Sequence, residues 1–305
     1  MEVVDFSARR CPLCRAGLIR VQDGSICSKC ARTFPRLPTG QGDYRLKSGE
    51  TVSYAGSYHP VAIDQEVQVG VRRESEAIPP RNSYRGRIPW HLTRQQVSYI
   101  PEATPGDVAL DLGCGTGLHR GLLQALGYRY YGVDYHGAGA DDLVDAHALP
   151  FAGEIFGLIL AVALLEHLAQ PWLAIAEMFR VLRPGARVVG TVAFLEPFHD
   201  NSFYHFSPLG LETALGGAGF EPEVIMCIGG WNVVRAQIEM GFERARLPRV
   251  VANVLSWPFV GLVETYAAAG RRVARDRRRH SRDLAHAKHA GAFFYVARRP
   301  AVRGG

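Results

Sequence analysis

Short apolar runs alternate with amphipathic stretches from about Pro101 to the end of the chain. This alternation is typical of α/β proteins, in which buried parallel strands are joined by helices that pack on the sheet. Residues 158–163 are apolar throughout, as expected of a strand buried on both faces. The pattern predicts strands over residues 108–112, 130–133, 158–163, 187–193, 223–228 and 293–297.

Apolar residues at helical spacing and nearby capping residues predict three helices between these strands. Residues 118–126 form the first, which Gly127 caps. The second begins at Pro171, a favoured first-turn residue, and ends before Arg183-Pro184-Gly185. Ser207-Pro208 opens the third, and Gly219 ends it. A long insert, residues 230–290, separates the last two strands and is expected to be helical.

Four of the six cysteines form two Cys-x-x-Cys pairs, Cys11 with Cys14 and Cys27 with Cys30. Each pair places two thiolates on one side of a tight turn, and two such pairs supply the tetrahedral sulfur site that structural Zn²⁺ takes. Redox-active dithiols are the alternative, although such motifs normally adjoin a helix in a βαβ unit. We therefore expect a zinc ribbon, folded by its metal, at the N-terminus.

Composition divides the chain into three parts. Residues 1–46 hold the two Cys-x-x-Cys pairs and form the predicted ribbon, and residues 47–100, rich in Ser, Gly, Pro, Tyr and Arg, are predicted to be a linker and lid segment. Residues 101–305 form the α/β domain. The chain is 47% apolar and 21% charged, which is typical of globular proteins. Its first ten residues lack the apolar run of a secretory signal, so we expect a cytoplasmic protein.

A glycine loop, Asp111-Leu-Gly113-Cys-Gly115-Thr-Gly117, joins the first predicted strand to the first helix. Glycines at such a turn let the backbone approach a ligand closely. Asp134 ends the second strand, where a carboxylate can accept hydrogen bonds from both ribose hydroxyls of an adenosine ligand. A nicotinamide-binding Rossmann domain is one alternative for these features. No Gly-Lys-Ser or Gly-Lys-Thr follows, which excludes a P-loop.

Further motifs follow in order: Asp145-Ala146, Leu149-Pro150-Phe151, Glu166-His167-Leu168 and Val181-Leu182-Arg183-Pro184-Gly185. From about Pro101 to Phe220 the chain resembles class I S-adenosylmethionine-dependent methyltransferases of the small-molecule type. The resemblance implies a Rossmann-like, seven-stranded, mostly parallel sheet whose last strand is antiparallel. The aromatic-Pro pair Phe34-Pro35 after the second cysteine pair resembles the small zinc-ribbon methyltransferase-activator family, over about residues 9–46.

The resemblance also implies roles for individual residues. Asp111, Gly113, Gly115 and Gly117 would cradle the methionine end of the cofactor, Asp134 would bind the ribose, and Asp145 and Ala146 would flank the adenine. Glu166 and His167 would line the place where methyl donor and acceptor meet. The chain departs from the family in three ways: the interval from Asp134 to Asp145 is short, Ala186 replaces a glycine, and Gly157 replaces an acid.

Polar residues gather after the strand predicted at residues 187–193, and His199 and His205 are the candidate general bases among them. A loop fixed by polar side chains is the alternative. The sequence after residue 162 lacks the Asn/Asp-Pro-Pro-Tyr motif typical of adenine amino-group methylation. We therefore expect a small-molecule or glycan-like biosynthetic acceptor, methylated at oxygen. The alternatives are an rRNA methyltransferase and a non-catalytic cofactor-binding partner protein.

A basic run of seven arginines and one acid lies at residues 271–282, after the apolar stretch 250–263, in a chain of net charge +6. A solvated helix face is the simplest interpretation. Residues 250–282 could also contact an anionic membrane surface. Nucleic-acid binding is less favoured, because the run has no interleaved aromatic residues for base stacking.

Overall fold

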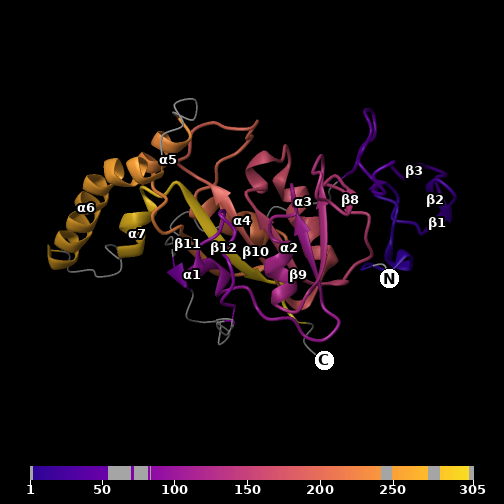
Figure 1. Cartoon of the computed structure of the whole chain (residues 1–305), viewed down its shortest axis with the longest axis horizontal. Helices are drawn as coiled ribbons and strands as arrows, with labels where there is room; N and C mark the ends of the chain where they lie inside the picture. Colours follow the sequence, from indigo (N-terminus) through magenta and orange to yellow (C-terminus); the bar gives the residue numbers. More distant parts are fainter. Residues whose placement is uncertain are drawn as a thin grey trace.

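Three regions follow one another across the molecule in the computed structural model (Figure 1). The structure describes residues 3–53, 70–71, 82, 84–241, 249–273 and 282–301. A small three-stranded sheet lies at one end and a large sheet occupies the middle. The other end is formed by helices α5 (Val233–Glu239), α6 (Arg249–Val273) and α7 (Arg282–Ala287).

The large sheet has nine strands within the described residues, in the order β4-β8-β7-β6-β9-β10-β12-β11-β5. Its seven middle strands confirm the expected sheet, and β12 runs antiparallel to both neighbours. The two outer strands come from the segment before residue 101, and strands of two residues leave no hydrophobic pattern to predict. The bounds are β4 Gly42–Asp43, β5 Gly70–Val71, β6 Val108–Leu112, β7 Arg129–Asp134, β8 Asp142–Leu143, β9 Phe156–Val162, β10 Leu182–Ala193, β11 Glu221–Cys227 and β12 Ala292–Arg298.

Strand β10 begins five residues earlier than the sequence predicts, directly after helix α3 (Pro171–Val181). Leu182 already pairs with Phe156 of β9, and the sheet register shifts before Arg187. Gly185 has a φ of +82° and donates its backbone N–H to the Arg299 carbonyl at 2.8 Å. The Arg-Pro-Gly segment therefore bends within an extended strand instead of separating the helix from it.

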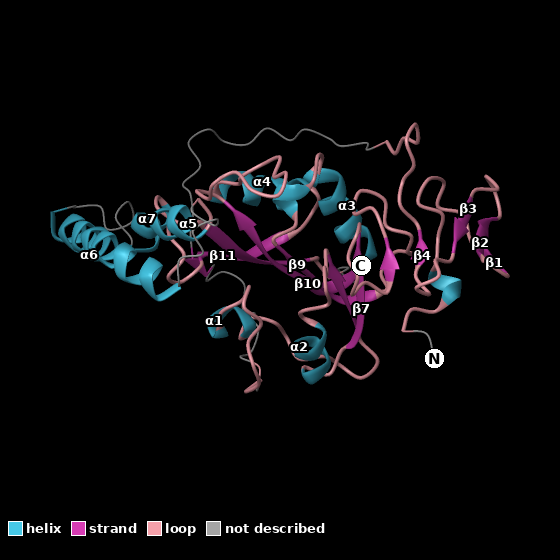
Figure 2. Ribbon diagram, turned by 45° about the horizontal axis from the view of Figure 1, so that its top comes forward, coloured by secondary structure: helices cyan, strands magenta, loops and turns pink. Residues whose placement is uncertain are grey.

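Helices cover both faces of the sheet, with α1 (Arg94–Val97) and α2 (Arg120–Ala125) on one face and α3 and α4 (Pro208–Gly217) on the other (Figure 2). Successive residues of β9 alternate between two apolar clusters, as side chains on a strand must. Leu158 and Leu160 pack with the α2 side, and Ile159 and Ala161 pack with the α3 side. Because the parallel strands run in one direction, their carboxyl ends lie at one edge of the sheet. Open α/β sheets bind ligands at that edge.

The N-terminal segment packs into the core of the large domain. Its strands β1 (Leu18–Val21), β2 (Gly24–Cys27) and β3 (Thr33–Pro35) form an antiparallel sheet. Phe34 and Tyr44 lie in the same apolar cluster as Phe151 of the large domain. Arg9 is 8% exposed, pairs with the Asp142 carboxylate and donates to the Tyr131 hydroxyl. A buried charge pair of this kind links the ribbon to the edge of the large sheet.

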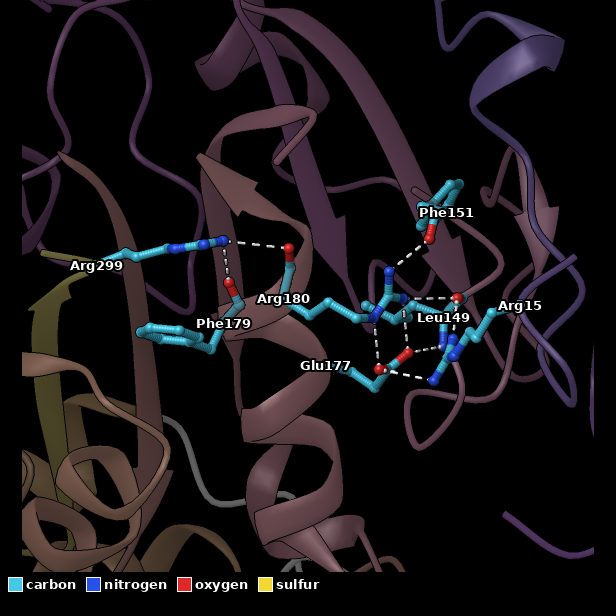
Figure 3. Close-up of polar contacts among 7 residues, drawn as sticks. All are labelled: Arg15, Leu149, Phe151, Glu177, Phe179, Arg180 and Arg299. Atoms are coloured by element: carbon cyan, nitrogen blue, oxygen red, sulfur yellow. Dashed lines mark hydrogen bonds and ion pairs between the residues drawn. The ribbon is translucent and has the colours of Figure 1, made fainter. Parts of the chain in front are cut away.

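The carboxylate of Glu177 on α3 connects the ribbon to the large domain, as Figure 3 shows. Its carboxylate accepts hydrogen bonds from the Leu149 backbone at 2.7 Å and from Arg180 at 2.8 Å, and it pairs with Arg15 at 2.8 Å. Arg180 also donates to the Phe151 carbonyl at 2.7 Å. The ribbon, helix α3 and the segment before β9 are therefore fixed to one another by a single buried carboxylate.

The region between β11 and β12 contains α5, α6 and α7, and α6 is the longest helix that the structure describes. Ala252, Ser256 and Val263 are its buried residues, whereas many of its apolar residues are exposed. No helix among the described residues is long and apolar enough to cross a membrane. Residues 274–281 of the basic run, and residues 54–69, 72–81 and 83 of the predicted linker and lid segment, lie outside the described residues.

Candidate functional site

The glycine loop follows β6, and its three glycines adopt left-handed conformations, with φ of +77° at Gly113, +54° at Gly115 and +77° at Gly117. Residues with a Cβ adopt such values at a cost, which explains why glycine occupies these positions. A Cβ on Gly113 would lie 2.9 Å from Cδ1 of Leu164, whereas one on Gly115 would meet open space. The backbone at Gly115 is therefore accessible to a ligand.

Asp134 lies at the carboxyl end of β7, next to the glycine loop. Its Oδ2 accepts the Gly115 N–H at 2.8 Å, and its Oδ1 accepts the N–H groups of His136 and Gly137 at 2.8 and 2.7 Å. The side chain is only partly buried. A carboxylate oxygen accepts more than one hydrogen bond, so Oδ2 retains capacity for a ligand hydroxyl.

Residues 135–141 form a loop that packs against the glycine loop, where a longer interval would have allowed a helix. The Gly139 N–H donates to the Gly115 carbonyl at 3.0 Å. A Cβ on Gly139 would lie 2.2 Å from the carbonyl carbon of Thr116. Sequence reasoning missed this contact, although the alternation of glycine and alanine at residues 137–140 was a visible signal for a close backbone approach.

Asp111, predicted to cradle the cofactor, is 1% exposed and lies behind the glycine loop. Its Oδ2 accepts a hydrogen bond from the Tyr130 hydroxyl at 2.9 Å, and its Oδ1 lies 3.4 Å from Nδ1 of the buried His119. Burial, together with the Asp111 charge, raises the pKa of Tyr130, which keeps this hydroxyl a donor. Asp111 is thus placed to hold the loop in shape through Tyr130 and His119.

Asp145 and Ala146 follow β8 at the same sheet edge, and the Val144 N–H donates to the Asp134 carbonyl at 2.8 Å. The Asp145 carboxylate accepts from the backbone of His147 at 3.0 Å and lies 2.6 Å from Nδ1 of His147. Burial opposes ionisation of Asp145, but these hydrogen bonds outweigh it and lower its pKa. Asp145 is therefore a carboxylate fixed by its own turn, close to Asp134.

Glu166 follows β9 in the 3₁₀ turn η2 (Leu165–His167) and is 2% exposed. Its Oε1 accepts the Ala193 N–H at 3.2 Å, and its Oε2 is buried without a hydrogen-bond partner. Burial, with the nearby Glu196 charge, raises the pKa of Glu166 to about 8. The preceding Ala163 has a φ of +49°, a strained value that tends to occur at functional sites.

Three histidines surround Glu166 at the ends of β9 and β10. The rings of His167 and His199 lie 5.2 Å apart, and those of His199 and His205 lie 6.0 Å apart. Burial lowers the pKa of His167 and of His205, which favours their neutral forms. Because β6 and β9 are parallel neighbours, the glycine loop and the Glu166 segment follow adjacent strands at the same edge of the sheet. The structure thus brings Glu166, His167, His199 and His205 together beside the loop.

The four ribbon cysteines meet as the sequence predicts, with Sγ–Sγ distances of 3.7 Å for Cys11 and Cys30 and 3.4 Å for Cys14 and Cys27. Zn–S bonds of about 2.3 Å in a tetrahedron place neighbouring sulfurs about 3.8 Å apart. Burial raises the pKa of Cys27, but hydrogen bonds from the backbone N–H groups of Cys30 and Lys29 outweigh this effect and lower the pKa to about 6. This donor set fits a structural Zn²⁺.

Comparison with known proteins identifies the large domain. Residues 110–190, which span the glycine loop, Asp134 and Glu166, match the methyltransferase domain family. Residues 110–190 therefore carry a methyltransferase domain, within the Rossmann-like sheet described above. An uncharacterised methyltransferase of Mycobacterium marinum is 34% identical over 131 residues, or 38% of this chain and 49% of the relative. The chain spans about half the length of the curated relatives that it matches.

Solved structures of methyltransferases resemble this methyltransferase domain at lower identity. The complex between the Haloferax volcanii Trm112 methyltransferase activator and a methyltransferase matches with a TM-score of 0.45, 18% identity and coverage of 71% of this chain and 92% of that chain. The Haemonchus contortus phosphoethanolamine N-methyltransferase 2, in complex with S-adenosylmethionine, matches with a TM-score of 0.40 and 18% identity. That match covers 64% of this chain and 49% of the other.

Proposed function

We propose that this protein transfers the methyl group of S-adenosylmethionine to an oxygen of a small-molecule or glycan-like biosynthetic acceptor in the cytoplasm. The observation that carries the proposal is the neighbourhood of two features at one sheet edge. The accessible glycine loop with Asp134 fits the cofactor, and the Glu166–histidine cluster beside it offers polar groups to an acceptor.

This geometry supports a role for each of the proposed cofactor residues. The backbone at Gly113, Gly115 and Gly117 would hold the methionine end, Asp134 the ribose, and Asp145 with Ala146 the adenine. Asp111 would act through Tyr130 and His119 by keeping the loop in place. S-adenosylmethionine supplies an activated methyl group, and the chain's own residues orient both reactants so that displacement occurs in line.

A hydroxyl acceptor must lose its proton, and His205 is placed to receive it. Its Nδ1 lies 3.0 Å from the Phe194 carbonyl, an acceptor-only group, so Nδ1 carries the hydrogen and Nε2 presents a lone pair. Ser202 Oγ, 3.3 Å from Nε2, lies on the same side. His199 is the second candidate. A positioned base contributes about 10²–10⁴-fold in rate.

Two measurements test this function. Calorimetry is expected to show S-adenosylhomocysteine binding in preference to NAD, and the reverse preference would contradict the methyltransferase proposal.

Incubation with radiolabelled S-adenosylmethionine and cell-extract fractions is expected to label the small-molecule fraction. His205→Ala is expected to lower that labelling at least about a hundredfold with unchanged S-adenosylhomocysteine affinity. Unchanged labelling would remove His205 as the base.

The alternatives predict different results in the same screen. An rRNA methyltransferase would label the RNA fraction and bind RNA with strong salt dependence. A non-catalytic partner protein would bind S-adenosylhomocysteine but label no fraction.

A further inference from the structure

The side chains of Glu166, His167 and His199 present donor atoms that all lie within 4.8 Å of one another. Apart from the four cysteines, the described residues contain no other group of three or more such ligands at this spacing. Glu166 and His167 come from η2 after β9, and His199 comes from the segment after β10. Two neighbouring strand ends therefore build one ligand set.

In both histidines a backbone carbonyl lies against Nδ1. Nδ1 of His167 lies 3.1 Å from the Asp200 carbonyl, and Nδ1 of His199 lies 2.9 Å from the Pro197 carbonyl. A carbonyl only accepts hydrogen bonds, so each Nδ1 carries the hydrogen and each Nε2 keeps its lone pair. A backbone carbonyl on the second ring nitrogen is the usual support of a metal-binding histidine.

Glu166 adds an independent observation. Its side chain is 2% exposed, yet Oε2 has no hydrogen-bond partner. Buried carboxylate oxygens are nearly always satisfied, so an orphaned one indicates a missing cation or donor. The nearby Glu196, whose Oε2 lies 3.8 Å from Nε2 of His199, adds further negative charge.

We propose that Glu166, His167 and His199 bind a divalent transition-metal ion such as Zn²⁺ or Co²⁺. Two imidazoles and one carboxylate suit such ions, whereas Mg²⁺ and Ca²⁺ prefer sites made of oxygens alone. Three protein ligands leave coordination positions open, as in catalytic rather than structural metal sites. An acceptor oxygen could occupy such a position. That role rests on the proposed function, but the metal binding does not. With His199 as a ligand, the general base is His205.

The test titrates Co²⁺ into the whole 305-residue chain after it has been loaded with one equivalent of Zn²⁺ for the ribbon. We expect one further equivalent to bind, with weak visible bands and without the strong thiolate absorption of a cysteine site. Glu166→Gln and His199→Ala are each expected to weaken this binding at least tenfold. His136→Ala, which removes an exposed histidine outside the cluster, is the matched control and should bind like the wild type.

The readout is metal binding, so it remains informative whether or not methyl transfer is observed. Circular dichroism establishes that each variant is folded. If Glu166→Gln fails to fold, Co²⁺ binding by the His167→Ala and His199→Ala variants tests the proposal in its place. The proposal is overturned if the wild type binds no second equivalent, or if folded His167→Ala and His199→Ala variants bind it as tightly as the wild type does.

Discussion

The carboxylate of Asp134 accepts backbone hydrogen bonds from two loops, through Gly115 on one side and His136 and Gly137 on the other. Removing it would leave ribose hydroxyls unpaired and would also release both loops. We expect Asp134→Ala to weaken S-adenosylhomocysteine binding by roughly 1–3 kcal/mol, measured by calorimetry. Asp134→Asn should lose less, because its amide oxygen still accepts one of these bonds.

The exposed Asp23→Ala in the ribbon is a charge-matched control and should bind like the wild type. Thermal melting of each variant separates a lost contact from a lost fold. Unchanged affinity in a folded Asp134→Ala variant would contradict the assignment.

Single residues differ in how far the sequence could place them. Asp134 and the three loop glycines were predictable, because a fixed spacing after a strand determines where they lie. The burial of Asp111 was not, since it depends on Tyr130 and His119, which are not part of the motif. The sequence also could not predict that Oε2 of Glu166 is buried without a hydrogen-bond partner, because this depends on how β10 packs beside η2.

In the proposed site two loops rather than one form the cofactor side, and Gly139 is the point where they touch. A Cβ at Gly139 would lie 2.2 Å from the carbonyl carbon of Thr116 and 2.6 Å from the Gly117 nitrogen. Backbone atoms cannot move aside as side chains can. We therefore expect Gly139→Ala to weaken S-adenosylhomocysteine binding at least tenfold and to lower the melting temperature, measured by calorimetry and circular dichroism.

Gly121→Ala is the matched control for this substitution. Gly121 lies in α2, where an added Cβ would meet nothing within 4 Å. Alanine favours a helix over glycine by roughly 1 kcal/mol, so this variant should be as stable as the wild type or more so. If both variants behave like the wild type, residues 135–141 do not brace the glycine loop.

At the scale of elements, the long apolar strands were predictable and the short ones were not. Strand β9 lies close to its predicted bounds, because all its residues but Gly157 are buried between the helices on the two faces. Strands β4 and β5 are two residues long and are defined by their pairing with β8 and β11, which the sequence does not reveal. The sequence also does not reveal the start of β10, which lies before Pro184 because Leu182 pairs with β9.

The ribbon braces the cofactor loops from outside. Gln41 Nε2 donates to the Ala140 carbonyl at 2.7 Å, and Leu37 packs against a cluster that contains Cys114 and Ala140. Because metal binding supplies the folding energy of so small a unit, losing zinc should loosen this brace. The sequence could not predict that the ribbon packs against the large domain, since Arg9 and Asp142, which form an ion pair between the two, are far apart along the chain.

We expect Cys27→Ser to release zinc, measured by elemental analysis, and to destabilise the whole chain by at least about 1 kcal/mol, or roughly 2–4 °C in melting temperature. S-adenosylhomocysteine binding should weaken several-fold as well. Cys227→Ser, at the end of β11, is the matched control and should retain zinc and cofactor affinity. A zinc-free Cys27→Ser variant with unchanged stability and affinity would show that the ribbon is independent of the domain.

Helix α6 lies at the end of the molecule opposite the ribbon (Figure 1), and many of its apolar residues are exposed. Its exposed apolar residues are Val250, Val251, Val254, Leu255, Trp257, Leu262 and Tyr266. An apolar helix face followed by basic residues is typical of helices that lie in the interface of anionic membranes, where each arginine contributes about 1 kcal/mol. The seven arginines of residues 271–282 supply that charge. We therefore expect the protein to bind anionic vesicles more tightly than neutral ones, and more weakly as salt is raised.

The substitution pair Trp257→Ser and Leu262→Ser separates this helix face from charge alone. Each side chain, 76% and 67% exposed in the free protein, would bury apolar area in the bilayer interface. Burying one such side chain is worth about 1.5–3 kcal/mol, so vesicle co-sedimentation should fall at least tenfold in the double variant. Trp90→Ser, at another exposed tryptophan, should change nothing. Equal binding by all three proteins would mean that the arginines act without α6, and RNA competing with the vesicles would then favour a nucleic-acid acceptor.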